Sequence, residues 1–268
     1  MSISLIKFTL PYESSQTNGF VFLPDPASDV KRGFGVFTHG FTSHKGSILN
    51  WCTRLAEEGM ACALFDLPGH YLGNFCEVTD FERFKIDAPK LFAQAFDVLK
   101  NEFKAHFPLY DHYLNAEEMK LVLGGHSLGA LLSLHAYSLP EFSEYDRIGI
   151  CVGLGMPPEG MTHLFDTAFY KSTLNVRAQL VSPALNPDIV FPWIKKDKEE
   201  LKLSDARLHF ITGEDDLVVG KTGTEQLVES LINKGNNVTL EKPARLGHQV
   251  PEMAAPHIKK FLKDSGIL

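Results

Sequence analysis

Cysteine is scarce in this chain. Its 268 residues include four cysteines, at Cys52, Cys62, Cys76 and Cys151. None of them stands in a Cys-x-x-Cys pair, and so few in a chain of this length make no disulfide framework. We therefore expect free, buried thiols in a reducing compartment.

Long apolar segments are also missing. The most apolar window, residues 121–139, is interrupted by histidines, serines and glycines, so it is a poor candidate for a membrane span. The first residues, Met-Ser-Ile-Ser-Leu-Ile-Lys, have no basic region followed by an apolar stretch, and we expect no secretory signal. These observations predict a cytoplasmic protein with no integral membrane span.

The chain has no excess of positive charge. Lysine and arginine number 26 against 33 aspartates and glutamates, which gives a formal net charge of −7. This balance gives no support to nucleic acid as a partner. No Gly-x-Gly-x-x-Gly follows the first strand, no Walker sequence occurs, and the histidines show no metal-ligand spacing. We expect no nucleotide cofactor, no metal and no nucleic-acid partner.

Short apolar runs alternate with segments of helical spacing. One such helical stripe consists of Phe92, Phe96, Leu99 and Phe103. Strands that alternate with crossover-length helices predict a mostly parallel sheet covered on both faces, here in a single domain over residues 1–268. The first two strands have no helix between them, which predicts an antiparallel edge. The expected strands are 3–10, 19–23, 33–38, 61–65, 120–123, 148–154, 208–212 and 238–240.

Two helix ends carry local signals. Gly59 follows a segment of helical spacing and is typical of the residue just past a helix. The segment Thr222-Gly-Thr-Glu225 predicts a capping box, in which the threonine and glutamate side chains bond the first backbone N–H groups of a helix.

The alternation of strands and helices is interrupted between residues 154 and 208. A structureless loop of about 50 residues is improbable in a compact domain, so residues 156–206 predict a short helical cap over one edge of the sheet. Its apolar side chains either pack on that edge or line a substrate pocket, and a lid does both. The candidates for the pocket are Phe165, Phe169 and Trp193. The charged run 195–200 in the same insertion predicts a solvated helix face.

The strongest local motif is Gly125-His126-Ser127-Leu128-Gly129, which follows an expected strand and opens an expected helix. In this context Gly-x-Ser-x-Gly forms a tight turn that exposes the serine hydroxyl, while the glycines let strand and helix pass closely. The N–H of Leu128 would lie at the helix N-terminus, where donors are free and an anion is favoured. Ser127 is therefore the candidate nucleophile.

At this point the chain resembles the serine hydrolases of the α/β-hydrolase fold. The resemblance implies a second oxyanion donor after the first buried strand, where His39-Gly40-Phe41 stands, and assigns it to the N–H of Phe41. A single glycine here is similar to esterases that lack the His-Gly-Gly-Gly loop. The segment Asp66-Leu67-Pro68-Gly69-His70 also resembles a family segment, to which we give a structural role in a turn beside the site.

A nucleophilic serine needs a general base and a carboxylate that orients it, and the chain order in this fold is Ser, acid, His. The run that begins at Gly213 resembles the family's Gly-x-x-Asp turn, which selects Asp216 over its neighbour Asp215. After the last strand, His248 stands on a loop, whereas His257 falls inside the final helix. The predicted catalytic triad is Ser127, Asp216 and His248.

These residues predict a serine hydrolase that cleaves a small-molecule carboxylic ester, of short to medium acyl chain, through an acyl-enzyme without a cofactor. A thioesterase or a small serine aminopeptidase would use the same residues and stays open. A non-catalytic ligand-binding protein and an acyltransferase are further alternatives. The sequence does not indicate an oligomeric state.

Overall fold

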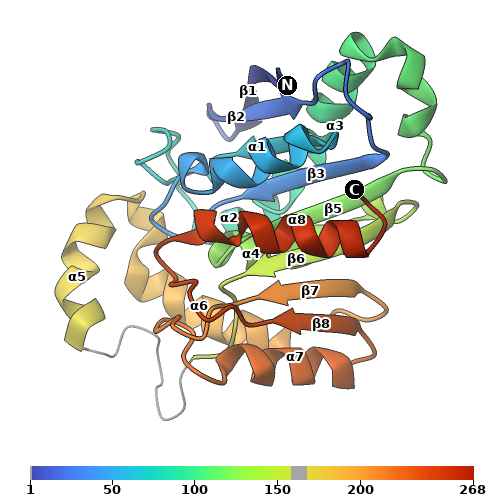
Figure 1. Ribbon diagram of the computed structural model, residues 1–268. Helices are drawn as coiled ribbons and strands as arrows, with labels where there is room; N and C mark the ends of the chain where they lie inside the picture. Colours follow the sequence, from blue (N-terminus) through green and yellow to red (C-terminus); the bar gives the residue numbers. More distant parts are fainter. Residues whose placement is uncertain (1, 158–167) are drawn as a thin grey trace.

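The computed structural model describes residues 2–157 and 168–268, with Phe169 and Tyr170 described by their backbone alone. Eight strands form one sheet in the order β1-β2-β4-β3-β5-β6-β7-β8 (Figure 1). The pairs β1–β2 and β2–β4 are antiparallel and the other neighbours are parallel, which confirms the predicted antiparallel edge on a mostly parallel sheet. The strands are β1 (Ser4–Tyr12), β2 (Ser15–Leu23), β3 (Gly33–Thr38), β4 (Ala61–Phe65), β5 (Lys120–His126), β6 (Asp146–Val152), β7 (Arg207–Ile211) and β8 (Asn237–Glu241).

Helices cover both faces of the sheet. On one face α1 (Leu49–Glu57) and α8 (Ala255–Asp264) share an apolar cluster with the strands. On the other face the cluster includes α3 (Lys90–His106), α4 (Leu128–Tyr137) and α7 (Gly223–Asn233). The short helix α2 (Phe81–Asp87) precedes α3. Short 3₁₀ segments span Lys45–Ile48, Pro108–Leu114, Pro140–Phe142, Pro183–Leu185 and Pro251–Ala254.

The central strand β3 is buried on both sides, as a parallel strand between two helical layers must be. Its side chains alternate between the layers. Val36 belongs to the cluster under α3 and α4, whereas Phe37 belongs to the cluster under α1 and α8. Because successive side chains of a strand point to opposite faces of the sheet, this one apolar run contributes to both hydrophobic clusters.

The parallel register brings the carboxyl ends of β3, β5, β6 and β7 to one edge of the sheet. Thr38 pairs with Gly125, and Val152 pairs with both His126 and Ile211. The segments that follow these strands therefore start side by side, although they are far apart in the sequence. This edge is where ligands bind in open α/β sheets.

Two helices of the cap lie beyond this edge (Figure 1). They are α5 (Ala168–Gln179) and α6 (Pro187–Glu200), so the described part of the 156–206 insertion contains the predicted helices. The turn at Gly69 connects the cap to the sheet, because its carbonyl accepts a 2.9 Å hydrogen bond from the N–H of Ser182. Gly69 has φ of +74°, a conformation that favours glycine, and it serves the structural turn expected of this segment.

The two local helix signals have different outcomes. Gly59 follows α1 with φ of +96°, as predicted for a glycine just past a helix end. Thr222 precedes α7 but makes no capping hydrogen bond with its side chain, so the predicted capping box is wrong. Its ψ of −1° is far from the extended conformation that directs an N-cap oxygen at the helix. The carboxylate of Glu225 instead accepts a hydrogen bond from Lys242.

Candidate active site

Ser127 occupies the turn between β5 and α4 with φ of +51° and ψ of −112°, a strained conformation for a residue with a side chain. The glycines of the motif permit this turn. A Cβ on Gly125 would lie 2.5 Å from the carbonyl carbon of Gly129. A Cβ on Gly129 would lie 2.5 Å from the carbonyl oxygen of His39. The strand, the helix and the loop after β3 therefore meet too closely for any side chain.

Two backbone N–H groups adjoin this turn. Leu128 is the first residue of α4, and Phe41 follows Gly40 in the loop after β3. A Cβ on Gly40 would lie 3.2 Å from the Cβ of Ser127, so this loop lies directly against the turn. In the described ranges, neither the N–H of Phe41 nor that of Leu128 donates a hydrogen bond to another residue. Both donors are thus available for an oxyanion at Ser127.

Asp216 and His248 are joined by a hydrogen bond although 32 residues separate them. Nδ1 of His248 donates to Oδ2 of Asp216 over 2.8 Å. The carboxylate is buried, and its Oδ1 accepts from the N–H groups of Val218 and Val219 at 2.9 and 3.0 Å. These bonds fix the carboxylate, which in turn fixes the orientation of the imidazole.

The neighbouring Asp215 makes a different contact. Its Oδ1 accepts a 2.8 Å hydrogen bond from the N–H of Leu246, two residues before His248. Gly213 packs against the same loop, since a Cβ there would lie 2.2 Å from the carbonyl oxygen of Leu246. Asp215 therefore holds the loop that carries the histidine, whereas Asp216 contacts the histidine itself.

A second histidine lies against His248. The rings of His126 and His248 are 4.7 Å apart between centroids. Burial, and then the proximity of His248, hold the pKa of His126 well below its ordinary value. His126 is therefore neutral, and its ring forms an uncharged wall beside His248.

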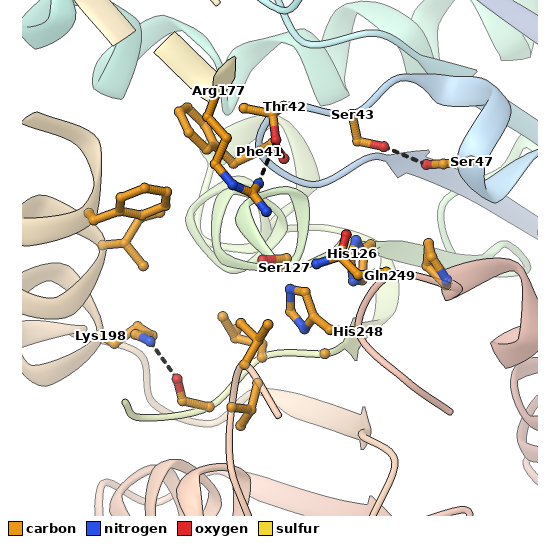
Figure 2. Close-up of a pocket in the computed structure, with 18 residues that line it drawn as sticks. Phe41, Thr42, Ser43, Ser47, His126, Ser127, Arg177, Lys198, His248 and Gln249 are labelled. Atoms are coloured by element: carbon orange, nitrogen blue, oxygen red, sulfur yellow. Dashed lines mark hydrogen bonds between the residues drawn. The ribbon is translucent and has the colours of Figure 1, made fainter. Parts of the chain in front are cut away.

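Ser127 and His248 line one cavity of about 140 Å³ beneath the cap (Figure 2). Apolar side chains form much of its wall, among them Phe41, Phe191 and Ile194. Figure 2 shows two cationic side chains from the cap in the same wall: Arg177 from α5 lies above Ser127, and Lys198 from α6 lies to the left of His248. The cavity thus combines the candidate nucleophile with apolar and positively charged groups.

Lys198 corrects one prediction from the sequence. Its charged run predicted a solvated helix face, but the Lys198 side chain is only 6% exposed. Its neighbours Lys196 and Glu200 do form an exposed pair, at 70% and 66%. Lys198 lies on the face of α6 that is directed toward the cavity. The charges along the run 195–200 do not indicate which of its residues lies on that face. Only the spacing in the sequence could have indicated this position. Phe191, Ile194 and Lys198 are three and four residues apart, so they lie on one face of the helix.

The three pocket candidates have different outcomes. Phe165 lies outside the described residues, and so does the side chain of Phe169. Trp193 is not brought to the cavity. Its ring instead packs edge-on against Phe81, with centroids 5.4 Å apart. The helical rotation between neighbouring residues turns Trp193 away from the face that carries Phe191 and Ile194.

No group of three or more histidine, cysteine, aspartate or glutamate residues in the described ranges could hold a metal ion. No helix within those ranges is long and apolar enough to cross a bilayer.

Comparisons with known proteins agree with this architecture. No family model matches the sequence, and no curated protein matches it. Solved structures do match. A soluble variant of monoglyceride lipase from Saccharomyces cerevisiae has a TM-score of 0.60 at 15% identity, covering 96% of this chain and 94% of its own. A cold-adapted esterase from an Arctic intertidal metagenomic library has a TM-score of 0.55 at 16% identity, covering 98% and 94%.

A third solved structure, an α/β serine hydrolase without a lid from Xanthomonas campestris, has a TM-score of 0.54 at 16% identity. It covers 96% of this chain and 94% of its own. Identities this low carry the fold and leave the reaction to the residues of the site. The sheet order, the turn at Ser127 and these matches together show that this chain has the α/β-hydrolase fold, the fold of serine hydrolases and esterases.

Proposed function

We propose that the protein is a serine hydrolase that cleaves a small carboxylic ester through an acyl-enzyme. The observation that carries the proposal is the 2.8 Å hydrogen bond from His248 to the buried Asp216, in the same cavity as a half-buried serine held in a strained turn. A nucleophile, a base and a carboxylate that orients the base are the three parts of this chemistry.

In the first half of the reaction, Oγ of Ser127 attacks the ester carbonyl carbon while Nε2 of His248 accepts the hydroxyl proton. The N–H groups of Phe41 and Leu128 donate to the oxyanion of the tetrahedral intermediate, each donor contributing about 3 kcal/mol. Asp216 stabilises the imidazolium and keeps Nδ1 protonated. His248 then protonates the leaving alcohol, and the carbonyl re-forms on the serine.

In the second half, water replaces the alcohol in the cavity. His248 removes a proton from the water, which attacks the acyl-serine, and the same two N–H groups bind the second oxyanion. Return of the proton to Oγ releases the acid and restores Ser127. The neutral wall of His126 suits this cycle, because a second positive charge there would disfavour the imidazolium that His248 becomes.

The size of the cavity supports a short acyl chain. Its volume of about 140 Å³ lies below the ~300–1,000 Å³ of sites that enclose drug-sized ligands. Phe191 and Ile194 provide apolar contact for a few methylenes, each worth about 0.8 kcal/mol when buried. An oxygen ester is the simplest substrate that this machinery accepts, and esterases are among the solved structures that resemble this chain.

Two alternative activities, thioester hydrolysis and aminopeptidase activity, can be distinguished from ester hydrolysis by the preferred substrate. A thioesterase would prefer an acyl-CoA, and an aminopeptidase would prefer an aminoacyl anilide, over p-nitrophenyl esters of the same acyl group. Measuring kcat/KM for the three substrate types on the purified protein decides among them.

The nucleophile is tested with an organophosphonate probe. The probe should attach covalently to Ser127, as located by peptide mass spectrometry, and Ser127→Ala should remain folded without labelling or turnover. Labelling that persists in Ser127→Ala would refute the proposal. A folded protein that shows neither labelling nor turnover would favour a ligand-binding role.

A further inference from the structure

Among the described residues that line the cavity, the charged side chains of lysine and arginine are both positive. Lys198 and Arg177 both contribute to its wall, and none of the described residues that line it is an aspartate or a glutamate. Asp216 is screened from this space behind His248, and its carboxylate is occupied by three hydrogen bonds. The described wall under the cap thus presents two cationic side chains and no carboxylate, in a chain whose net charge is −7.

Lys198 occupies an unusual position for an ammonium group. The side chain is buried, and Nζ donates one hydrogen bond to the carbonyl oxygen of Gly155, in the segment that follows β6. The described residues provide no carboxylate within ion-pair distance of it. An ammonium has three N–H donors, so this bond leaves donors for an anion in the cavity. Burial also lowers the pKa of Lys198 to about 8, and at neutral pH the group remains mostly charged.

Arg177 approaches the serine from the other helix of the cap. Its Nη1 donates a 3.0 Å hydrogen bond to Oγ1 of Thr42, which follows the oxyanion candidate Phe41. This bond anchors the guanidinium beside the loop after β3, and Figure 2 shows it between that loop and Ser127. A planar guanidinium matches the oxygens of a carboxylate or a phosphate better than a point charge does.

We propose that the ester cleaved at Ser127 carries an anionic group, a carboxylate or a phosphate, which Lys198 and Arg177 bind beneath the cap. The inference rests on the proposed hydrolase function and adds the charge of its substrate. A cavity of about 140 Å³ suits an anionic group only a few bonds from the scissile carbonyl, as in the half-ester of a short dicarboxylic acid.

A purely structural role for Lys198 makes a different prediction. Its bond to Gly155 links α6 of the cap to the segment that follows β6, which a neutral donor could do without a buried charge. If Lys198 is only such a link, its removal changes stability and affects neutral and anionic esters equally. If it binds the substrate, its removal affects the anionic esters alone.

The substrates for the test are pairs that differ mainly in charge. Monoethyl glutarate against ethyl pentanoate places a carboxylate on the acyl half. The acetate ester of 3-hydroxypropanoate against butyl acetate places it on the alcohol half, and 2-phosphoethyl acetate replaces the carboxylate with a phosphate. Hydrolysis is followed by acid release at constant pH. We expect the anionic member of at least one pair to have a kcat/KM tenfold or more above its neutral partner.

The variants are Lys198→Met, Lys198→Arg and, as a matched control on the same helix, Lys196→Met. Lys198→Met should lower kcat/KM for the anionic ester at least tenfold more than kcat/KM for its neutral partner. Lys198→Arg should retain part of the preference because it keeps the charge. The control should behave as the wild type, since the side chain of Lys196 is 70% exposed.

A preference for the neutral ester in every pair would overturn the inference, and so would an anionic preference that survives both Lys198→Met and Arg177→Gln. Failure of the hydrolase function is separate: the phosphonate probe would then not label Ser127. In that case, anion binding in the cavity is measured directly by calorimetric titration of glutarate and inorganic phosphate into the folded protein. Binding that Lys198→Met abolishes would support it, and no binding of either anion would overturn it.

Discussion

At the scale of the residue, the two candidate acids, Asp215 and Asp216, are adjacent in the sequence, but their hydrogen bonds differ. The carboxylate of Asp216 accepts from His248, whereas that of Asp215 accepts from the backbone of Leu246. Both aspartates contribute to the position of the histidine, but only Asp216 contacts the imidazole, as the acid of the proposed triad must.

Asp216→Asn should therefore lower kcat by roughly 10³–10⁴-fold, because an amide no longer holds the imidazole in the tautomer with Nδ1 protonated. Steady-state hydrolysis of p-nitrophenyl butyrate measures this. Asp215→Asn is the matched control, since the amide oxygen can still accept from Leu246, and its activity should stay near that of the wild type. If Asp215→Asn were the more damaged enzyme, the assignment of the acid would have to move by one residue.

At the scale of the element, the junction of β5 and α4 depends on the closeness of three backbone segments. A Cβ on Gly129 would lie 2.5 Å from the carbonyl oxygen of His39 and 2.6 Å from that of Thr38. Alanine favours helices, so any destabilisation by Gly129→Ala is steric. We expect a loss of about 1–3 kcal/mol in the free energy of unfolding, measured with urea, together with a lower kcat.

Gly247→Ala provides the steric control for this prediction. A Cβ there would meet its nearest atom at 3.7 Å, an ordinary contact. Its free energy of unfolding should change by less than about 0.5 kcal/mol, as is usual for substitutions that create no clash. Equal stability of the two variants would show that the junction can relax and that the glycine is not required.

The cap helix α6 places two aromatic residues on different faces, which allows its role in selectivity to be tested. Phe191 lines the cavity and packs edge-on against Phe41 at 5.0 Å, whereas Trp193 packs against Phe81. Phe191→Ala should enlarge the cavity and shift the preferred acyl length to longer chains in a series of p-nitrophenyl esters. Trp193→Ala should leave the profile unchanged while lowering stability. An unchanged profile in Phe191→Ala would place the acyl chain elsewhere.

At the scale of the whole molecule, the buried Lys198 couples unfolding to pH. Its pKa in the folded protein is about 8, against an ordinary value of 10.5. Between these values the unfolded chain retains a proton that the folded protein has released, so the free energy of unfolding rises with pH. Below pH 8 both states are charged, and the folded state bears the full cost of burying the ammonium.

The measurable quantity is the free energy of unfolding of the wild type minus that of Lys198→Met, from urea titrations at pH 7 to 10. This difference should rise by about 2 kcal/mol across the range, at up to 1.4 kcal/mol per pH unit above pH 8. Lys196→Met should give a flat difference. A flat line for Lys198→Met would mean that the ammonium is not buried in solution.

Much of the architecture could be predicted from the sequence because it depends on local chemistry and on period. Apolar runs predicted the strands, the missing helix between the first two predicted the antiparallel edge, and the glycines around Ser127 predicted a turn with backbone closely packed on each side. The spacing from Gly213 selected Asp216, and the structure brings that residue to His248. Local signals failed where the backbone conformation overrode them, as at Thr222.

The contents of the cavity were decided by the tertiary structure alone. Whether Phe191 or Trp193 faces the serine depends on the rotation of α6 against the sheet, which no pattern within the helix specifies. The burial of Lys198 depends on the contact between α6 and the segment that follows β6. The two residues that make this contact, Lys198 and Gly155, are 43 residues apart in the sequence. The sequence by itself thus determined the fold and pointed to the candidate catalytic residues, because periodicity and turn chemistry are local. Which side chains surround the substrate was left to tertiary packing, because that is set by how separate elements meet.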